Sequence, residues 1–339
     1  MLRALKRLNG VKEPEKAKDA ALKPANGQEN QGDVVPMEED KVVPMEVELK
    51  TTRPTLMDIE INCVELADDI YKYLVNHEKK FVLEEGFMNG GEPTNRMRKI
   101  LIDWLVQVHS RFHLTPETLH LTVNILDFML AKKAVGKSEL QLLGVGAMFV
   151  ATKFEEVFLP DIQDFAFVSE DAFDKVGILR MEQFILNSLD FDLSCPSILV
   201  FARSISRVLT ENMDVDVQQY FITYNMSKCL AEYSFLDAIM SSVSKSHIAM
   251  AAMTIALQLC PVYNLSPEVA EQLMLARLGA TKNDINVAVT LLAQVVLQQM
   301  KSEKIHAIRT KYQSSKLAKA SQILATNEAA EILTKLIPQ

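Results

Sequence analysis

Two stretches of this chain repeat one another: GVGAMFVA at residues 144–151 and AMAAMTIA at residues 249–256, 105 residues later. Small residues recur at matching places, at 144 and 249, 146 and 251, 147 and 252, and 151 and 256. The first stretch lies in a predicted helix from about Glu139 to Glu156 that is apolar nearly all round, as a buried central helix is. The period is too long for a common solenoid unit. The sequence therefore predicts two copies of a domain of about five helices, each built around a central helix that its neighbours approach closely.

Capping signals predict further helices around these central stretches. Thr94 can cap a helix whose apolar residues return every three or four positions. Thr115-Pro116-Glu117 opens the next helix with a capping hydroxyl and a proline in the first turn, and Ser266-Pro267-Glu268 does the same in the second copy. Two more helical pieces of the first copy are expected at Asp161–Phe167 and Ser169–Leu189. The helix that Thr94 caps has an apolar face made of Met97, Ile100, Leu101, Trp104, Leu105, Val108 and Phe112.

The composition favours helices packed around a sizeable core. Apolar residues make up 48% of the 339 residues, which excludes a chain that is disordered throughout. The chain has only 11 glycines and 12 prolines, whereas β and α/β folds need many tight turns and glycine-rich loops. The predicted fold class is therefore all-α.

Charge and cysteine usage bear on the classes of partner. The net charge of −8 argues against a nucleic-acid-binding protein, although the stretch from Lys301 to Lys319 is basic. No run of about 18 apolar residues is present, so no membrane partner is expected. The cysteines form no CxxC pair and are interpreted as reduced, partly buried thiols of an intracellular protein, not as a metal site. They are Cys63, Cys195, Cys229 and Cys260.

Residues 1–56 differ in composition from the rest of the chain. Lys, Glu, Gln, Asn, Asp and Pro dominate there, and aromatic residues are absent. Such a segment has little apolar area to offset the entropy lost on ordering, so a disordered regulatory tail is expected. The pentapeptide VVPME occurs at both 34–38 and 42–46. It is either a linear binding motif or, more simply, a neutral duplication.

The two central helices end differently. After Ala151 the first copy reads TKFEE, whereas the aligned residues 257–261 of the second copy read LQLCP. A Lys153 that served only the fold would be expected to recur in the second copy, where Gln258 stands instead. The charged end of this helix therefore indicates a surface that only the first domain uses. The simpler alternative is a solvated helix end.

Four motifs in the right order resemble the cyclin family, and the last two of them resemble the B-type mitotic cyclins in particular. They are MRKILIDWL at 97–105, ATKFEE at 151–156, DFAFV at 164–168 and KYQSSK at 311–316. The resemblance covers roughly residues 57–325. It implies two tandem five-helix cyclin boxes with an N-terminal helix and a disordered N-terminal tail. The implied divisions are the first box with the preceding helix at 57–193, the second box with a C-terminal extension at 194–325, and a C-terminal tail at 326–339.

The resemblance also implies a function. B-type cyclins are non-catalytic regulatory subunits, without a cofactor, that bind and activate a mitotic cyclin-dependent Ser/Thr kinase at the transition from G2 to mitosis, in the nucleus and cytoplasm. Lys153 and Glu182 match a pair that hydrogen-bonds the kinase backbone beside its regulatory αC helix. Phe154, Leu186 and Phe191 match apolar residues that pack on that helix. Without the resemblance, Glu182 would be an ordinary acid on a helix surface.

A second set of residues matches the hydrophobic patch with which cyclins dock substrates that carry Arg-x-Leu segments. This set comprises Met97, Ile100, Leu101, Trp104, Gln107 and Leu140. Spacing alone would place Met97, Ile100 and Trp104 in the core instead. Lys99 stands where the family usually has alanine, so a long cation in the patch is expected to change which docking segments fit.

Three further features follow from the resemblance. Arg98 and Asp127 match an internal ion pair of the box and are interpreted as structural. Phe128 stands where an arginine is common, and the sequence offers no reason for it. Arg53-Pro54-Thr55-Leu56 fits an Arg-x-x-Leu destruction box, with Arg53 and Leu56 as its two fixed residues, so ubiquitin ligase machinery is a candidate partner.

Three other classes of function compete with a kinase activator. An enzyme is disfavoured, because the glycines form no phosphate-binding loop, no HExxH is present, and the adjacent Glu155 and Glu156 point about 100° apart on a helix. A transcription adaptor with the same helical repeat should show a basic face, and the folded region has only the Lys301–Lys319 stretch. A plain helical scaffold would leave the asymmetry at Lys153 unexplained.

Overall fold

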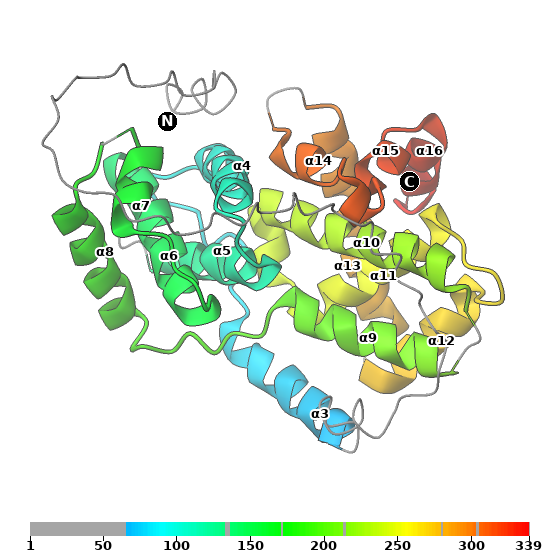
Figure 1. Cartoon of the computed structure of the whole chain (residues 1–339). Helices are drawn as coiled ribbons and strands as arrows, with labels where there is room; N and C mark the ends of the chain where they lie inside the picture. Colours follow the sequence, from blue (N-terminus) through cyan, green and yellow to red (C-terminus); the bar gives the residue numbers. More distant parts are fainter. Residues whose placement is uncertain are drawn as a thin grey trace, which may run out of the picture.

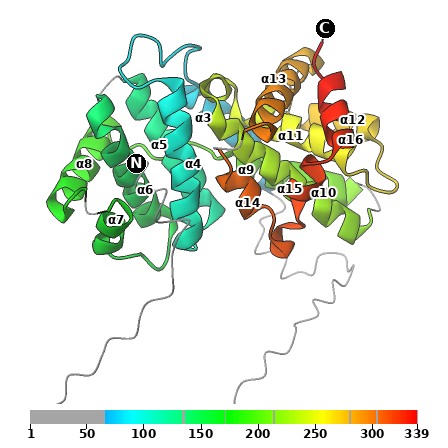
Figure 2. The same cartoon turned by 90° about the horizontal axis from the view of Figure 1, so that it is seen from above.

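The computed structural model describes residues 66–132, 136–170, 172–212, 215–278, 281–302 and 305–338. Across these ranges the chain is built from helices, and the only pairing of extended residues is an isolated bridge between Val262 and Leu265. Two bundles of five α-helices lie side by side (Figures 1 and 2). The predicted all-α fold with two tandem five-helix domains is therefore confirmed.

The first bundle, called box 1 here, surrounds α6. Its helices are α4 (Asn95–Arg111), α5 (Pro116–Ala131), α6 (Leu140–Glu155), α7 (Ile162–Val168) and α8 (Lys175–Ser188), with the short η3 (Lys137–Glu139) before α6. As predicted, α6 packs against α4, α5, α7 and α8. A Cβ atom on Gly146 would lie 2.5 Å from Cγ of Met181, and one on Gly144 would lie 2.9 Å from a methyl group of Leu101. These two glycines let α8 and α4 approach the central helix.

The second bundle, box 2, repeats this plan around α11. Its helices are α9 (Ile198–Asn212), α10 (Val217–Tyr233), α11 (Lys245–Leu259), α12 (Pro267–Leu278) and α13 (Lys282–Met300), with η4 (Ser234–Leu236) and η5 (Ala238–Ser242) between α10 and α11. The central α11 packs against α9, α10, α12 and α13. Its residues 249–252, which align with 144–147 of α6, are all buried. The repeat seen in the sequence is thus a repeat of central helices.

Helix α3 (Ala67–Glu78) precedes box 1 in the sequence but is anchored on box 2. The ring of Tyr71 meets the ring of Phe201 in α9 edge to face, with centroids 5.9 Å apart. Glu78 contacts Ser246 near the start of α11. The following turn, η2 (Lys79–Phe81), returns to box 1, where Phe81 lies 5.8 Å from Phe128 of α5. This contact gives Phe128 the structural reason that the sequence did not supply.

The end of the chain is packed onto both boxes. It contains α14 (Ala307–Lys311), η6 (Ser315–Leu317), α15 (Ala320–Leu324) and α16 (Asn327–Lys335). Residues 326–339, expected as a tail, instead hold α16, whose Ala329 and Leu333 are buried and which packs against α13 and α11. The hydroxyl group of Thr290 in α13 also donates to the carbonyl of Leu336.

Two local predictions need correction. The helix expected from Ser169 to Leu189 begins only at Lys175, because the Asp174 carboxylate accepts a hydrogen bond from the amide of Gly177 and caps α8 there. Thr94 does cap α4 by accepting from the amide of Met97. Thr115, in contrast, makes no side-chain cap on α5, because its hydroxyl group donates to Glu156.

Candidate functional site

Lys153 of α6 and Glu182 of α8, which are 29 residues apart in the sequence, lie together in the fold. Nζ of Lys153 is 2.8 and 3.0 Å from the two carboxylate oxygens of Glu182. Lys153 sits in the last turn of α6, where a cation also compensates the negative end of the helix dipole, and its Nζ lies 4.3 Å from the ring centroid of Phe149. The side chains are 42% and 12% exposed. The pair is therefore formed before any partner binds and remains open to solvent.

Exposed or half-buried apolar residues follow Lys153 and Glu182 closely along the chain. Phe154, next to Lys153, is 58% exposed, and Leu186 lies one turn after Glu182 on α8. Phe191 is 68% exposed, and its amide donates to the carbonyl of Leu186. Asp190 and Phe191 both have positive φ angles, of 51° and 58°, which is costly for residues other than glycine. The fold thus holds a large aromatic side chain in solvent at a strained backbone position.

An exposed apolar loop that the sequence reasoning missed extends this surface. Val157, Phe158 and Leu159 follow α6 and are 87%, 90% and 53% exposed. Glu156, just before them, accepts hydrogen bonds from the amide and hydroxyl of Thr115 and from the hydroxyl of Thr118. Burial raises the pKa of the Glu156 carboxyl group, but these hydrogen bonds outweigh it and lower the pKa overall. The signal in the sequence was an apolar run, VFLP, between two helices.

Helix α3 presents a second exposed apolar surface. Leu66, Ile70 and Tyr73 are 57%, 46% and 61% exposed and lie three or four positions apart, on one side of a helix. The ring of Tyr73 stacks on His77, whose Nε2 lies 2.8 Å from Oγ of Ser194, close after Phe191 in the linker between the boxes. We call these three residues the α3 stripe. The stripe is connected to the surface around Phe191 through His77.

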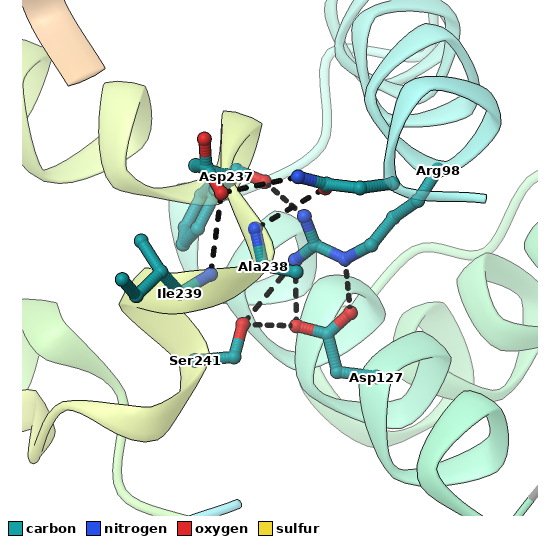
Figure 3. A network of polar contacts seen from close by, with 8 residues as sticks. Arg98, Asp127, Asp237, Ala238, Ile239 and Ser241 are labelled. Carbon is teal, nitrogen blue, oxygen red and sulfur yellow. Dashed lines mark hydrogen bonds and ion pairs between the residues drawn. The ribbon is translucent and has the colours of Figure 1, made fainter. Parts of the chain in front are cut away.

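Arg98 and Asp127 form the ion pair expected of them, and the pair also makes hydrogen bonds to residues of box 2. The guanidinium group donates to both Asp127 oxygens at 2.6 and 2.7 Å, and both side chains are buried. Arg98 also donates to the carbonyl of Phe235 and to the hydroxyl of Ser241, and Ser241 donates to Asp127 (Figure 3). Because Phe235 and Ser241 belong to η4 and η5, the pair joins the two boxes.

The residues expected to dock substrates are only partly on the surface. Leu101 and Trp104 are fully buried and Leu140 is 3% exposed, because this face of α4 packs against α6. The surface of the expected patch is therefore limited to Met97, Ile100 and Gln107, which are half-buried. The spacing argument that placed Trp104 in the core is correct. The indole N–H of Trp104 has no acceptor within the described residues.

Lys99 belongs to a different face of α4 from the patch residues. One turn earlier, the amide group of Asn95 donates to Asp237 and accepts from the amide of Ala238 in box 2. Burial lowers the pKa of Lys99, and the nearby Asp237 carboxylate opposes this shift. Lys99 therefore faces box 2, so the expectation that it alters the docking patch is not supported by its position.

Several other expectations concern ligands and the chain outside this site. The described residues contain no cluster of His, Cys, Asp and Glu suited to a metal ion. Cys195, Cys229 and Cys260 are free thiols, of which the last two are buried. Among the described helices, none is both long and apolar enough to cross a membrane. Arg53, Leu56 and Cys63 lie outside the described residues.

Comparison with family models decides the family. Residues 69–194 match the cyclin N-terminal domain, and residues 196–326 match the cyclin C-terminal domain. The chain is a member of the cyclin family. The boundary between the two matches falls in the linker between box 1 and box 2.

Curated relatives place this cyclin among the B-type mitotic cyclins. It is 53% identical over 322 residues to G2/mitotic-specific cyclin-B1 of Caenorhabditis elegans, which covers 93% of this chain and 89% of that one. It is 39% identical over 268 residues to G2/mitotic-specific cyclin-B2 of Oryzias javanicus, covering 79% and 67% of the two chains. Its role as a regulatory cyclin of the cell cycle follows from this membership.

A solved structure agrees with the fold. The cyclin resembles a viral cyclin from herpesvirus saimiri with a TM-score of 0.59 and 19% identity, over 67% of this chain and 96% of that one. At this identity the likeness concerns the fold alone.

The two motifs that pointed to the B type have structural roles in this cyclin. In DFAFV, Phe165 is buried and contacts the rings of Phe112 and Phe149, with centroids 5.1 and 5.2 Å away. In KYQSSK, Nζ of Lys311 and the hydroxyl of Tyr312 both donate to the buried carboxylate of Glu232 in α10. The second motif therefore fastens the C-terminal segment to box 2.

Proposed function

We propose that this cyclin is a non-catalytic subunit that binds a mitotic cyclin-dependent kinase through the face around Lys153 and Glu182. A protein kinase needs its strand lysine paired with the αC glutamate and its Mg²⁺ held by its own aspartate. A cyclin face that fits αC only in its inward position favours the active kinase by its differential affinity. The nucleotide, metal and catalytic groups would all belong to the kinase.

The observation that carries this proposal is the ion pair of Lys153 and Glu182 amid exposed apolar side chains. Phe154, Phe191 and the 157–159 loop leave large apolar areas in solvent, which marks a surface that a partner covers. The Lys153 ammonium group and the Glu182 carboxylate can exchange their contact with each other for hydrogen bonds to backbone groups of the partner. The strained Phe191 fits a residue held for binding and not for the fold.

The α3 stripe would form a second part of the same interface. Leu66, Ile70 and Tyr73 serve no core, since their side chains face solvent. Through His77 and Ser194 the stripe continues to Phe191, so one partner can cover both surfaces. Contact with two patches restricts the orientation of a bound kinase more than contact with either patch alone.

Three narrower roles are also part of the proposal. Substrates with Arg-x-Leu segments would dock at Met97, Ile100 and Gln107, and the unpaired indole N–H of Trp104 would meet a peptide carbonyl if the side chains that cover it moved aside. Ubiquitin ligase machinery would read Arg53 and Leu56. The protein would act in the nucleus and cytoplasm, as the resemblance to B-type cyclins implies.

The test is a reconstituted kinase assay. The full chain, alone and mixed with a mitotic cyclin-dependent kinase, is assayed for phosphorylation of Ser/Thr-Pro substrates. We expect no activity from the chain alone and an increase of orders of magnitude in the mixture. Phosphorylation by the chain alone at a matching rate, or a mixture no more active than the kinase alone, would contradict the proposal.

A further inference from the structure

Helix α3 is held in place by a small set of side chains, of which Leu74 and Val75 are partly buried against the apolar core. Of its 12 residues, only Tyr71 and Glu78 are buried. Both contact box 2: Tyr71 meets Phe201 of α9, and Glu78 meets Ser246 of α11. An isolated helix of this length is marginal in water, so α3 needs these anchors to keep its place.

Glu78 is the polar anchor. It is the last residue of α3 and is 3% exposed. One carboxylate oxygen accepts from the amide of Ser246 at 3.0 Å, and the other accepts from the hydroxyl of the same residue. A buried carboxylate must keep such donors, because the ionised group left without them would be strongly destabilised.

The start of α11 benefits from this carboxylate. Ser244, the residue before the helix, makes no side-chain cap. The first amides of a helix lack partners within the helix, and the positive end of its dipole attracts an anion. Glu78, 168 residues away in the sequence, therefore supplies the acceptor that the local sequence does not. The central helix of box 2 and the end of α3 are joined at this point.

We propose that Glu78 is a positioning residue for partner binding: it fixes α3 on box 2 so that the α3 stripe faces the kinase together with Phe191. This inference rests on the proposed function, since it assumes that the stripe contacts the kinase. Through Glu78, box 2 then contributes to kinase affinity by holding α3 in place, and this contribution needs no direct contact between box 2 and the kinase. If α3 leaves its position in most molecules, the apparent affinity falls in proportion to the fraction that remains competent.

The experiment is a double-mutant cycle on kinase affinity with the full chain. Glu78→Ala is expected to weaken binding about tenfold, equivalent to about 1.4 kcal/mol. Ile70→Ala removes part of the stripe, and in that background Glu78→Ala should cost clearly less, because a misplaced stripe has less to lose. Ser246→Ala removes the hydroxyl donor but keeps the backbone amide, so it should show a smaller loss with the same coupling. This milder variant keeps the test valid if Glu78→Ala folds poorly.

Asp284→Ala is the matched control. Asp284 accepts hydrogen bonds from Thr281 at the start of α13, in box 2, and its carboxylate is exposed. Its loss should lower stability as a lost cap does but leave kinase affinity unchanged. A Glu78→Ala protein that binds the kinase normally when folded, or an equal loss with and without Ile70, would overturn the proposal.

Hydrogen exchange of the free protein separates this inference from the proposed function. Glu78→Ala should speed exchange of the α3 amides more than that of the α6 amides, whether or not any kinase binds. Unchanged exchange in α3 would overturn the anchoring role. A wild-type chain that binds no kinase would instead contradict the proposed function, with the exchange result still standing.

Discussion

At the scale of single residues, Lys153 and Glu182 give the sharpest prediction for binding. Lys153→Ala and Glu182→Ala should each weaken kinase affinity about ten- to a hundredfold, because a charge-assisted hydrogen bond desolvated on binding contributes about 1.5–3 kcal/mol. The free protein should melt almost normally, since a partly exposed ion pair contributes about 1 kcal/mol or less. Calorimetric titration and a melting curve measure both effects.

The control for this pair is Lys282→Ala in box 2. Nζ of Lys282 lies 2.9 Å from a carboxylate oxygen of Glu271, and the Lys282 side chain is more exposed than that of Lys153. The substitution therefore removes a similar ion pair that lies away from the proposed interface. Its kinase affinity should equal that of the wild type. Full affinity in both Lys153→Ala and Glu182→Ala would remove the main support for the interface.

Arg98 gives the opposite prediction. Arg98→Ala leaves the buried Asp127 carboxylate with only the Ser241 hydroxyl and frees the Phe235 carbonyl, so it should cost about 3–5 kcal/mol of stability without any kinase present. Urea unfolding measures this loss. An unchanged midpoint would mean that the ion pair does not hold the two boxes.

His109 gives a prediction about pH. Burial, with Lys311 nearby, lowers the pKa of His109 to about 3. Between an unfolded pKa of about 6.5 and this value, the unfolded chain binds a proton that the folded chain does not. Stability should therefore be complete above about pH 6.5 and fall with acidification, by up to about 1.4 kcal/mol per pH unit from this group.

His109→Gln tests that dependence, because it removes the titrating group while keeping an amide near the Thr115 carbonyl. Chemical unfolding of the wild type and the variant at pH 7 and pH 5 gives the change in the free energy of unfolding with pH for each protein. The variant should lose less stability between the two pH values than the wild type does. His120 is present in both proteins, and because burial is the main cause of its lowered pKa and His109 the last of the causes, most of its contribution cancels in the comparison. An equal loss of stability in the two proteins would contradict the prediction that His109 causes this pH dependence.

At the scale of elements, the contact between α6 and α8 positions the proposed site. Gly146→Ala places a Cβ within 2.5 Å of Met181 and 3.2 Å of Ile185, both on α8. We expect a loss of about 1–3 kcal/mol from overpacking, and weaker kinase binding as Glu182 moves away from Lys153. Thermal melting and titration measure the two effects. A variant that melts normally would show that α8 adjusts without cost.

At the scale of the whole molecule, the C-terminal segment ties the boxes together. Asp103 of α4 accepts hydrogen bonds from the amides of His306 and Ala307, at the start of α14. Glu232 of box 2 holds Lys311 and Tyr312 of the same segment. Residues from both boxes therefore converge on α14.

Removal of residues 301–339 tests this role. We expect calorimetry to show lower stability and two separate transitions in place of one cooperative transition, because box 1 and box 2 lose a shared element. Removal of residues 1–56, which the composition marks as a tail, should leave a single transition and full kinase activation. One cooperative transition after the C-terminal removal would mean that Arg98 and Asp127 suffice to couple the boxes.

The sequence by itself determined the helices, their repetition and the family. Capping residues such as Thr94, apolar spacing of three and four, and the repeat centred on Gly146 are local signals, and they require no knowledge of distant contacts. The same signals marked Lys153 as the exception between the two copies. Only the resemblance to cyclins picked out Glu182 as its partner.

The tertiary structure alone decided which surfaces those helices expose. It turns Lys99 toward box 2, packs α16 where a tail was expected, and uncovers the 157–159 loop. It also assigns α3 to box 2 through a contact between residues 168 apart in the sequence. Helix periodicity shows that a residue lies on a given side of its helix. Which side meets a neighbour depends on contacts between segments far apart in the chain, and no local pattern records them.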